Sequence, residues 1–378
     1  MTSEVTPMPQ IAQLQVSPEI SHAFDLAFLE AEKFRGQTNP NPPVGAAALD
    51  AQGAVLGVNA HRFSGESHAE AGLIENLKKL GKAELVDTVV ITLEPCNHFG
   101  RTPPCSEALI RDLPRLKRVF YAQPDPNQKV SGGGPGRLRQ SGIQCELVAS
   151  PAIQRRGLEL IAAFWVKTQL GRPLITVKTV HRGNYTKESL ERLAAELPSP
   201  EFENSMIPPE GQATFGDRAQ LEQAHLLRRR ADLILTGSGT VLADQPSFTV
   251  RYVDDFKDKK RKIWVLDRRD RVRHQLPEYF DLAAKRGFEV LKVESEFDYS
   301  LPSVFGYLSR LSQNDSKFME VLVEAGPRLT KAILLSGFYD LHVVMACCDP
   351  NEKNKPLSQT AITAFTLFNE KTFGFAQS

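Results

Sequence analysis

The chain has 378 residues, 41% hydrophobic and 24% charged, and this length and composition predict two globular domains and exclude wholesale disorder. Lysine and arginine (46) balance aspartate and glutamate (45), so the net charge of +1 disfavours a protein that binds nucleic acid through phosphate contacts. With five cysteines, no signal-like start and no apolar run of about 18 residues, the sequence predicts a cytoplasmic protein without disulfides or a membrane span.

Helix and strand patterns alternate along the first part of the chain. Residues 1–18 are polar and are predicted to form a loose leader, and apolar residues at helical spacing predict a helix from Ile20 to near Gly36. The proline-rich segment 39–45 is predicted to be a loop. Strands are predicted over residues 46–49, 55–60, 86–93, 117–122 and 144–148, with helices over 69–80 and 105–112. This alternation indicates a layered α/β domain, to which we assign residues 19–150.

A second set of elements follows a linker predicted over residues 151–171. Residues 182–216 are polar, contain prolines and lack periodicity, so we expect a long excursion after the first strand. Strands are predicted over residues 174–180, 231–236, 262–267, 289–293, 319–324 and 340–346, and helices over 217–230 and 328–336. We assign residues 172–378 to a second α/β domain and predict no element for the last thirty residues.

Three potential metal ligands lie in separate segments of the first domain. His68 begins the motif His68-Ala69-Glu70, and Cys96 follows Pro95 and precedes Cys105 by nine positions. One imidazole and two thiolates suit Zn²⁺ with a fourth position open for water. Such a metal lowers the pKa of its water to about 7, and Glu70 is suited to move the water's proton to a leaving amine. The pattern matches the H-x-E…P-C signature of zinc deaminases, with a longer spacing between the cysteines than C-x-x-C.

Other interpretations of these residues stay open. The two cysteines can be packing residues, or the zinc can be purely structural, as in an interaction module without chemistry. A nucleic-acid-editing deaminase is disfavoured by the balanced charge and by the lack of interleaved aromatic and basic residues. Cys145 is expected in the core, and of the adjacent Cys347 and Cys348 one side chain is expected to pack inward and the other to face outward. His61 and His98 are expected to be polar loop residues.

The segment TLEPCNHFGRTPPC (Thr92 to Cys105), with NPNPPVG before it and DPN (residues 125–127) after it, resembles the deaminase half of the bifunctional riboflavin-biosynthesis deaminase/reductase family. The resemblance implies a cytidine-deaminase-like three-layer fold and a phosphoribosylated diaminopyrimidine as substrate. It implies one zinc ion per chain, held by His68, Cys96 and Cys105, with Glu70 as the proton shuttle. The substrate contacts that it implies in this half are Asn39, Asn41 and Arg101.

The second domain contains two separated motifs at strand ends. ADLILTGSGTVLADQPSFTVR (residues 231–251) runs from a strand into a glycine-rich loop, where Gly237 and Gly239 allow close backbone approach and Thr240 suits a phosphate. VEAGPRLTKAIL (residues 323–334) places a helix N-terminus after another strand. Neither motif is a G-x-G-x-x-G fingerprint, so a dinucleotide-binding Rossmann domain is disfavoured.

Together these motifs resemble the reductase half of the same family, which implies a dihydrofolate-reductase-like fold and NADPH as cofactor. The implied substrate contacts are Arg228, Phe248, Arg251 and Glu324, and the implied cofactor contacts are Thr240, Asp244, Gly326, Pro327 and Leu329. The chain departs from the family pattern at residues 177–184, where LKLxxSLDG is expected, and has Gln245 where a second aspartate is expected.

These departures leave an alternative to the bifunctional enzyme: a monofunctional deaminase with a degenerate reductase-like domain that binds ligand. The bifunctional interpretation predicts zinc-dependent deamination followed by NADPH-dependent reduction of the ribosyl side chain to ribityl. It also predicts a homo-oligomer that has no nucleic-acid or membrane partner.

Overall fold

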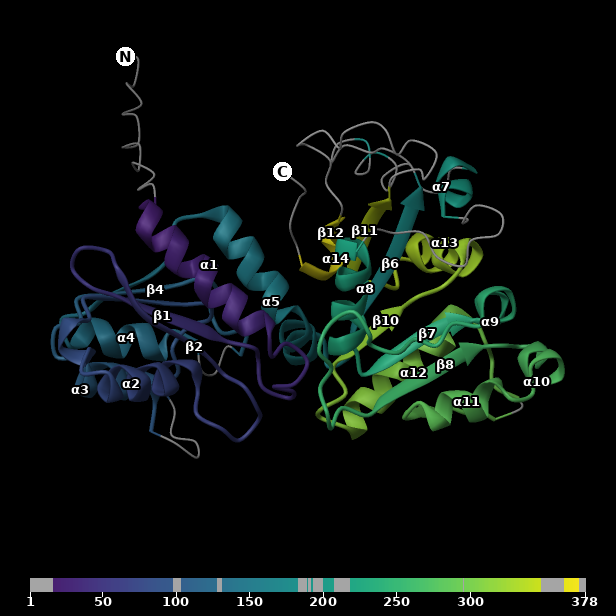
Figure 1. Ribbon diagram of the computed structural model, residues 1–378, viewed down its shortest axis with the longest axis horizontal. Coiled ribbons are helices and arrows are strands. Elements are labelled where there is room, and N and C mark those ends of the chain that lie inside the picture. Colours follow the sequence, from purple (N-terminus) through teal and green to yellow (C-terminus); the bar gives the residue numbers. More distant parts are fainter. Residues whose placement is uncertain are drawn as a thin grey trace, which may run out of the picture. The chain divides into compact units, whose positions relative to one another are not determined.

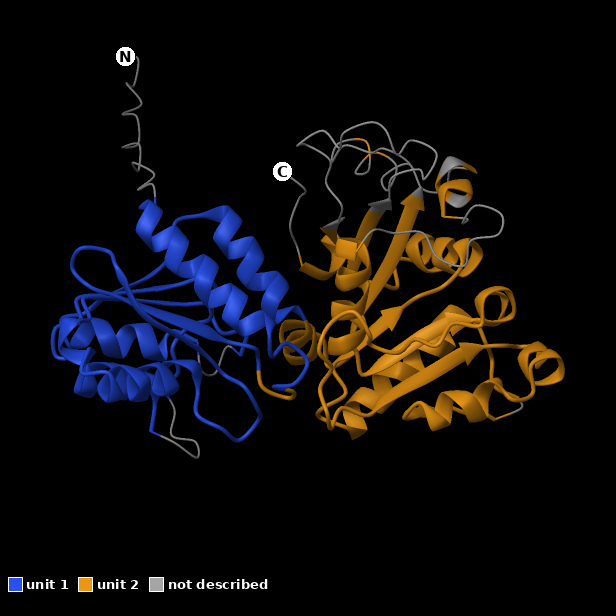
Figure 2. Ribbon diagram, viewed as in Figure 1, with its two compact units in different colours: residues 1–38, 42–162 blue, residues 39–41, 163–378 orange. Residues whose placement is uncertain are grey.

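The computed structural model describes residues 16–97, 103–127, 131–182, 189, 192, 200–206, 218–294, 296–347 and 364–373. The chain forms two compact units, one of residues 1–38 and 42–162 and the other of residues 39–41 and 163–378 (Figure 2). The boundary falls inside α5 (Pro151–Leu170), so the segment that we expected to be a linker is a helix. Leu160 and Ile161 are buried in the core of the first unit, and this packing stabilises the helix despite Gly157.

The first unit is built on a five-stranded sheet with the order β2-β1-β3-β4-β5 (Figure 1). The strands are β1 (Gly45–Leu49), β2 (Val55–Ala60), β3 (Thr88–Ile91), β4 (Arg118–Tyr121) and β5 (Gln144–Leu147). β1 runs antiparallel to β2 and β3, whereas β3, β4 and β5 are parallel to one another. The strands predicted from the sequence match these five in order and approximate extent.

Helices cover both faces of this sheet, because the strands are apolar on both sides. α1 (Pro18–Glu32) and α5 pack on the face that carries Ala47 and Val90. α2 (Ala69–Lys79), α3 (Cys105–Asp112) and α4 (Gly133–Gln140) pack on the face of Ala46 and Ala48, with the short 3-10 helix η1 (Ala83–Leu85) after α2. The result is the expected three-layer α/β unit (Figure 1).

Helix α4 was not predicted, because its sequence GGPGRLRQ is poor in helix formers. Close packing explains its composition. A Cβ atom on Gly134 would lie 1.8 Å from the carbonyl oxygen of Pro95, so only glycine lets α4 approach the segment that carries Cys96.

The second unit contains a seven-stranded sheet with the order β12-β11-β6-β10-β7-β8-β9 (Figure 1). The strands are β6 (Leu174–Arg182), β7 (Leu233–Gly237), β8 (Arg261–Leu266), β9 (Phe288–Val290), β10 (Glu320–Val323), β11 (Leu341–Cys347) and β12 (Ala364–Phe368). All neighbours are parallel except β12, which pairs antiparallel with β11. β12 lies in the C-terminal segment for which no element was predicted.

Side chains alternate between the two faces of this sheet. Val321 and Val323 of β10 pack beside α12 (Leu301–Asn314) and α13 (Pro327–Ser336), where Phe202 of α7 (Pro200–Ser205) joins them. Leu322 faces the other way, against α8 (Arg218–Arg230). That second face is completed by α9 (Ser238–Asp244), α10 (Arg271–Gln275) and α11 (Tyr279–Lys285), and α14 (Glu370–Phe373) ends the described chain.

The parts of the chain that the structure describes contain no helix with both the length and the apolar character needed to cross a membrane.

Candidate functional site

The three candidate metal ligands come together in the first unit although they lie on different segments. His68 precedes the first turn of α2, Cys105 begins α3, and Cys96 lies in the loop after β3. The Nδ1 atom of His68 lies 3.7 Å from the Sγ of Cys96 and 3.4 Å from the Sγ of Cys105. All three ligand atoms lie within 4.8 Å of one another.

This donor set fits a zinc ion. Bonds of about 2.0–2.3 Å to a tetrahedral Zn²⁺ place neighbouring nitrogen and sulfur ligands about 3.6 Å apart, close to the two distances seen here. In the described chain, no other group of three histidine, cysteine or acidic side chains is arranged to hold a metal. Three protein ligands leave one position of a tetrahedron for water, the arrangement of a catalytic site.

Protonation of the cluster is uneven. The pKa of Cys96 is lowered to about 4, because the Cys105 side chain and His68 hydrogen-bond its sulfur. The pKa of Cys105 is raised, mainly because its proton is held by the Cys96 sulfur and because the thiol is buried. Hydrogen bonding to Cys96 raises the pKa of His68 to about 9. The lowered pKa of Cys96 favours the thiolate, the form of cysteine that binds metals.

Glu70 lies in the first turn of α2 and is buried. Burial is the main cause that raises its pKa, and the neighbouring Cys96 raises it further. A carboxyl group in this position, two residues after a metal ligand, is suited to accept and return a proton.

Glu94 holds the loop that carries Cys96, a role that the sequence analysis missed. Its buried carboxylate accepts hydrogen bonds from the backbone N–H of Asp125 at 3.2 Å, the Ser131 hydroxyl at 3.1 Å and the backbone N–H of Gly132 at 2.5 Å. These bonds tie the segment after β4, which includes the DPN motif, to the residue two positions before Cys96. The signal in the sequence was an acidic residue directly after an apolar predicted strand.

Other sequence candidates in this unit have mixed outcomes. Cys145 is buried in the core and His61 lies in the loop after β2, both as expected, although the His61 side chain is buried. The His61 ring packs edge-on against His68 at 5.7 Å, and its Nδ1 lies 3.0 Å from the Ser67 carbonyl oxygen. Arg101 and His98 lie outside the described residues, as does Cys348.

Asn39 and Asn41 belong to the second unit by their contacts, although they precede β1 of the first unit in the sequence. The side-chain amide of Asn39 donates a hydrogen bond to the Asp232 carboxylate at 3.3 Å.

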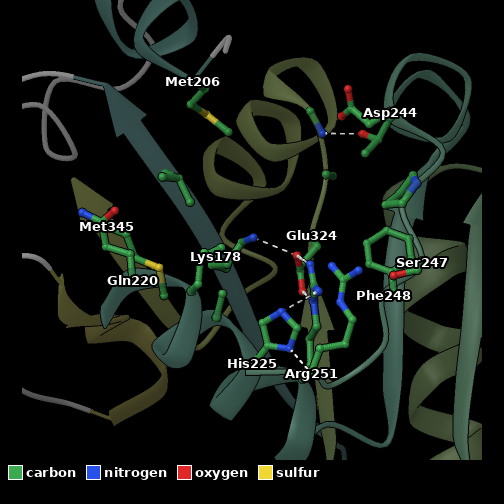
Figure 3. A pocket seen from close by; sticks show the side chains of 18 of the residues that line it. Lys178, Met206, Gln220, His225, Asp244, Ser247, Phe248, Arg251, Glu324 and Met345 are labelled. Carbon is green, nitrogen blue, oxygen red and sulfur yellow. Dashed lines mark hydrogen bonds and ion pairs between the residues drawn. The ribbon is translucent and has the colours of Figure 1, made fainter. Parts of the chain in front are cut away.

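A cavity of about 440 Å³ lies at the carboxyl ends of parallel strands β6, β7 and β10 in the second unit (Figure 3). Ligands of open α/β sheets bind at this edge. All four predicted substrate contacts line the cavity, together with three of the predicted cofactor contacts: Arg228, Phe248, Arg251, Glu324, Thr240, Asp244 and Gly326. Pro327 and Leu329 belong to α13 and are not among the lining residues.

A buried carboxylate organises the centre of the cavity (Figure 3). Glu324 accepts two hydrogen bonds from the Arg228 guanidinium at 2.6 and 2.9 Å, and one from the Lys178 ammonium at 2.7 Å. Burial opposes ionisation of Glu324, but the charges of Arg228 and Lys178 outweigh it and hold the pKa of this carboxyl well below its ordinary value. Arg228 also lies over the Phe248 ring, 5.6 Å from its centre.

His225 and Lys178 line the cavity but were not predicted as site residues. The Nδ1 of His225 accepts the backbone N–H of Arg251 at 2.7 Å, and its Nε2 lies 3.4 Å from a guanidinium nitrogen of Arg228. Burial, followed by the positive charges of Arg228 and Arg251, lowers the pKa of His225 to about 4. The sequence signal for His225 was its position one helical turn before Arg228 in α8. Lys178 lies in the segment 177–184 that departs from the family pattern.

The segment after β7 forms helix α9 rather than the predicted glycine-rich loop. Its Thr240 hydroxyl accepts the backbone N–H of Gly326 at 2.8 Å, so the two motifs of this domain meet at the cavity. Burial raises the pKa of Asp244 at the end of α9. Beyond it, Phe248 adopts a φ of +53°, a strained backbone for an aromatic residue, which places its ring against Arg228.

Two family models match the chain. Residues 18–123 match the cytidine and deoxycytidylate deaminase zinc-binding region, and residues 204–347 match the RibD C-terminal domain. The chain is 31% identical over 334 residues to the riboflavin biosynthesis protein RibD of Aquifex aeolicus, with 84% of each chain covered. It is 32% identical over 325 residues to that of Mycobacterium tuberculosis, with 84% of this chain and 82% of the relative covered.

Two solved structures have a similar fold. Acinetobacter baumannii RibD matches with a TM-score of 0.58 and 25% identity, covering 91% of this chain and 89% of that one. A deaminase/reductase from Thermotoga maritima shares the fold with a TM-score of 0.61 and 23% identity, covering 95% of this chain and 91% of that one.

Proposed function

This chain belongs to the RibD family of riboflavin biosynthesis proteins, and on that basis we propose that it catalyses two successive steps of riboflavin synthesis. It carries both a deaminase zinc-binding region and a reductase domain, so a monofunctional deaminase is not favoured. The balanced charge and the family likewise disfavour a nucleic-acid-editing enzyme or an interaction module. The proposed substrate of the first unit is 2,5-diamino-6-(5-phosphoribosylamino)pyrimidin-4-one.

In the proposed deamination, His68, Cys96 and Cys105 hold zinc, which when bound supplies a Lewis acid that makes water nucleophilic at neutral pH. Glu70 takes a proton from the attacking water and transfers it to the amino group of the pyrimidine. The carbon–nitrogen bond then breaks, ammonia leaves and the ring keeps a carbonyl oxygen. Glu94 holds the Cys96 loop in place during this step.

In the proposed reduction, NADPH supplies the hydride chemistry when bound in the cavity of the second unit. With the cofactor bound, the reduction would place a hydride on the ribosyl carbon and a solvent proton on the ring oxygen, which would open the sugar to a ribityl chain. Thr240, Asp244 and the segment from Gly326 through Pro327 and Leu329 are the proposed cofactor contacts.

The charges of the cavity support a phosphorylated substrate. The Glu324 carboxylate is already paired with Arg228 and Lys178, whereas the exposed Arg251 guanidinium meets no acceptor in the described part of the chain. An arginine fork without a partner suits phosphate, which it pairs bidentately. We therefore assign Arg251 to the substrate's phosphate, and Arg228, Phe248 and Glu324 to the pyrimidine end.

The observation that carries the proposal is the meeting of His68, Cys96 and Cys105 beside buried Glu70. A Glu70→Gln variant tests it, because the amide keeps the shape of the carboxyl group but can neither accept nor return a proton near neutral pH. Ammonia release should fall by about 10²–10⁴-fold with zinc content unchanged, while NADPH oxidation with the deaminated pyrimidine persists. Full ammonia release by Glu70→Gln would refute the assignment.

Asn39, Asn41 and Arg101 remain proposed substrate contacts of the deaminase, and residues 19–150 and 172–378 remain the proposed domains. We also propose a homo-oligomer in the cytoplasm, which size-exclusion chromatography with light scattering and cell fractionation test directly.

A further inference from the structure

A continuous chain of buried hydrogen bonds joins two histidines of the second sheet to helix α7. The Nε2 of His342 lies 2.9 Å from the Thr179 hydroxyl, which lies 3.0 Å from the Nε2 of His181. The Nδ1 of His181 lies 2.8 Å from the Ser205 hydroxyl, and Ser205 donates to the backbone carbonyl of Phe202 at 3.0 Å. The side chains of all five residues are buried.

The last hydrogen bond of the series, from Ser205 to Phe202, determines which atom donates in each of the others. Because the Ser205 hydroxyl donates to a carbonyl, its oxygen accepts a hydrogen bond from Nδ1–H of His181. Nε2 of His181 is then an acceptor for the Thr179 hydroxyl, whose oxygen accepts Nε2–H of His342. Every donor in the chain meets an acceptor when both imidazoles are neutral, and burial lowers the pKa of His181 to about 4 and that of His342 to about 3.

This series of hydrogen bonds fixes α7 on the sheet. Thr179 and His181 project from β6 and His342 from the adjacent strand β11, while Ser205 ends α7. The ring of Phe202 fills the space beside them, 4.7 Å from the His181 ring.

The residue after Ser205 connects α7 to the cavity. Met206 lines the cavity together with Val180 of β6 and Met345 of β11 (Figure 3). Thr179 and His181 alternate along β6 with Lys178 and Val180, so the strand presents the hydrogen-bond chain on one face and the cavity wall on the other. Whatever holds Ser205 therefore sets where Met206 lies.

We propose that the His342–Thr179–His181–Ser205 chain is a positioning device for the reductase reaction, which holds α7 on the sheet so that Met206 closes the apolar wall of the pyrimidine subsite. The inference rests on the proposed reductase function.

Thr179→Val tests the proposal, because valine keeps the shape of threonine but removes the hydroxyl at the centre of the chain. Thr179→Ser is the rescue variant, since it keeps the hydroxyl. The matched control is Thr176→Val on the same strand, whose buried hydroxyl donates to Glu320 and lies outside the cavity lining. NADPH oxidation is measured with the deaminated pyrimidine supplied directly.

We expect Thr179→Val to raise the KM for the pyrimidine about fivefold or more with kcat nearly unchanged, and Thr179→Ser and Thr176→Val to stay near wild type. An unchanged KM in Thr179→Val, or an equal rise in Thr176→Val, overturns the proposal. If Thr179→Val does not fold, Ser205→Ala breaks the same chain at α7 and carries the same expectation. Either variant in a Met206→Ala background should add little to the KM, because both changes act on one contact.

Hydrogen exchange separates this proposal from the proposed function. The backbone amides of residues 200–206 should exchange faster in Thr179→Val than in Thr176→Val, whether or not the protein oxidises NADPH. A wild-type protein that oxidises no NADPH with the pyrimidine refutes the reductase function, whereas equal exchange in the two variants refutes the positioning device.

Discussion

Removing the charge of Glu324 should damage both the stability and the activity of the second unit. A Glu324→Gln substitution leaves Arg228 and Lys178 without their shared carboxylate, and these side chains are only 13% and 14% exposed. Removing one partner of a buried ion pair costs about 3–5 kcal/mol. Taking about 3 kcal/mol, the melting temperature of a unit of this size should fall by roughly 6–12 °C.

The matched control is Glu320→Gln, on the preceding strand β10. Glu320 is also buried and pairs with Arg230 at 2.8 Å, but it does not line the cavity. Both variants should lower the calorimetric transition of the second unit, whereas only Glu324→Gln should abolish NADPH oxidation with the deaminated pyrimidine. Zinc content and ammonia release should stay unchanged in both. Equal losses of reduction in the two variants, or an unshifted transition in Glu324→Gln, would refute this reasoning.

Three further predictions concern packing, pH and metal. Gly134→Ala should lower zinc content and ammonia release, because the added Cβ meets the Pro95 carbonyl. The control Gly136→Ala on the same helix meets no atom within 4 Å and should raise the free energy of unfolding by about 0.5–1 kcal/mol. Equal zinc content in the two variants contradicts this prediction. Because the pKa values of His181 and His342 are lowered in the folded protein, the unfolded chain binds more protons than the folded chain below about pH 6.5. The free energy of unfolding should therefore be highest above that pH and should fall towards pH 4, by up to ~3 kcal/mol for His181. Urea midpoints measured across this range should fall less in His181→Gln, and a parallel fall contradicts the assignment. Removing zinc with a chelator should stop ammonia release but leave NADPH oxidation with the deaminated pyrimidine, and loss of both activities contradicts two separate sites.

The sequence predicted the metal cluster because its chemistry is local to short motifs. His68 is the residue before helix α2, Glu70 lies in the first turn of that helix, and Cys105 begins α3, so ordinary helix patterns were enough to place these three residues. The sequence could not show that Glu94 gathers three donors from a segment more than thirty residues away, because that pairing depends on strand order.

The second unit was harder to predict where glycine and proline occur within helices. Gly237 and Gly239 suggested a loop, but burial of Val241 against β7 and β8 stabilises helix α9. Residues 151–171, predicted as a linker, form helix α5 because Leu160 and Ile161 are buried in a core that no local pattern reveals. The excursion after β6 lacks periodicity, and the hydrogen bonds that fix α7 come from histidines on two strands, which no local pattern reveals.

Zinc K-edge absorption spectroscopy of the purified protein tests the central claim most directly. His68, Cys96 and Cys105 predict one zinc per chain with two sulfur neighbours at about 2.3 Å and two nitrogen or oxygen neighbours at about 2.0 Å, one of them exchangeable. A shell of four sulfur atoms, a fourth protein ligand in place of water, or a protein that binds no zinc would contradict the account.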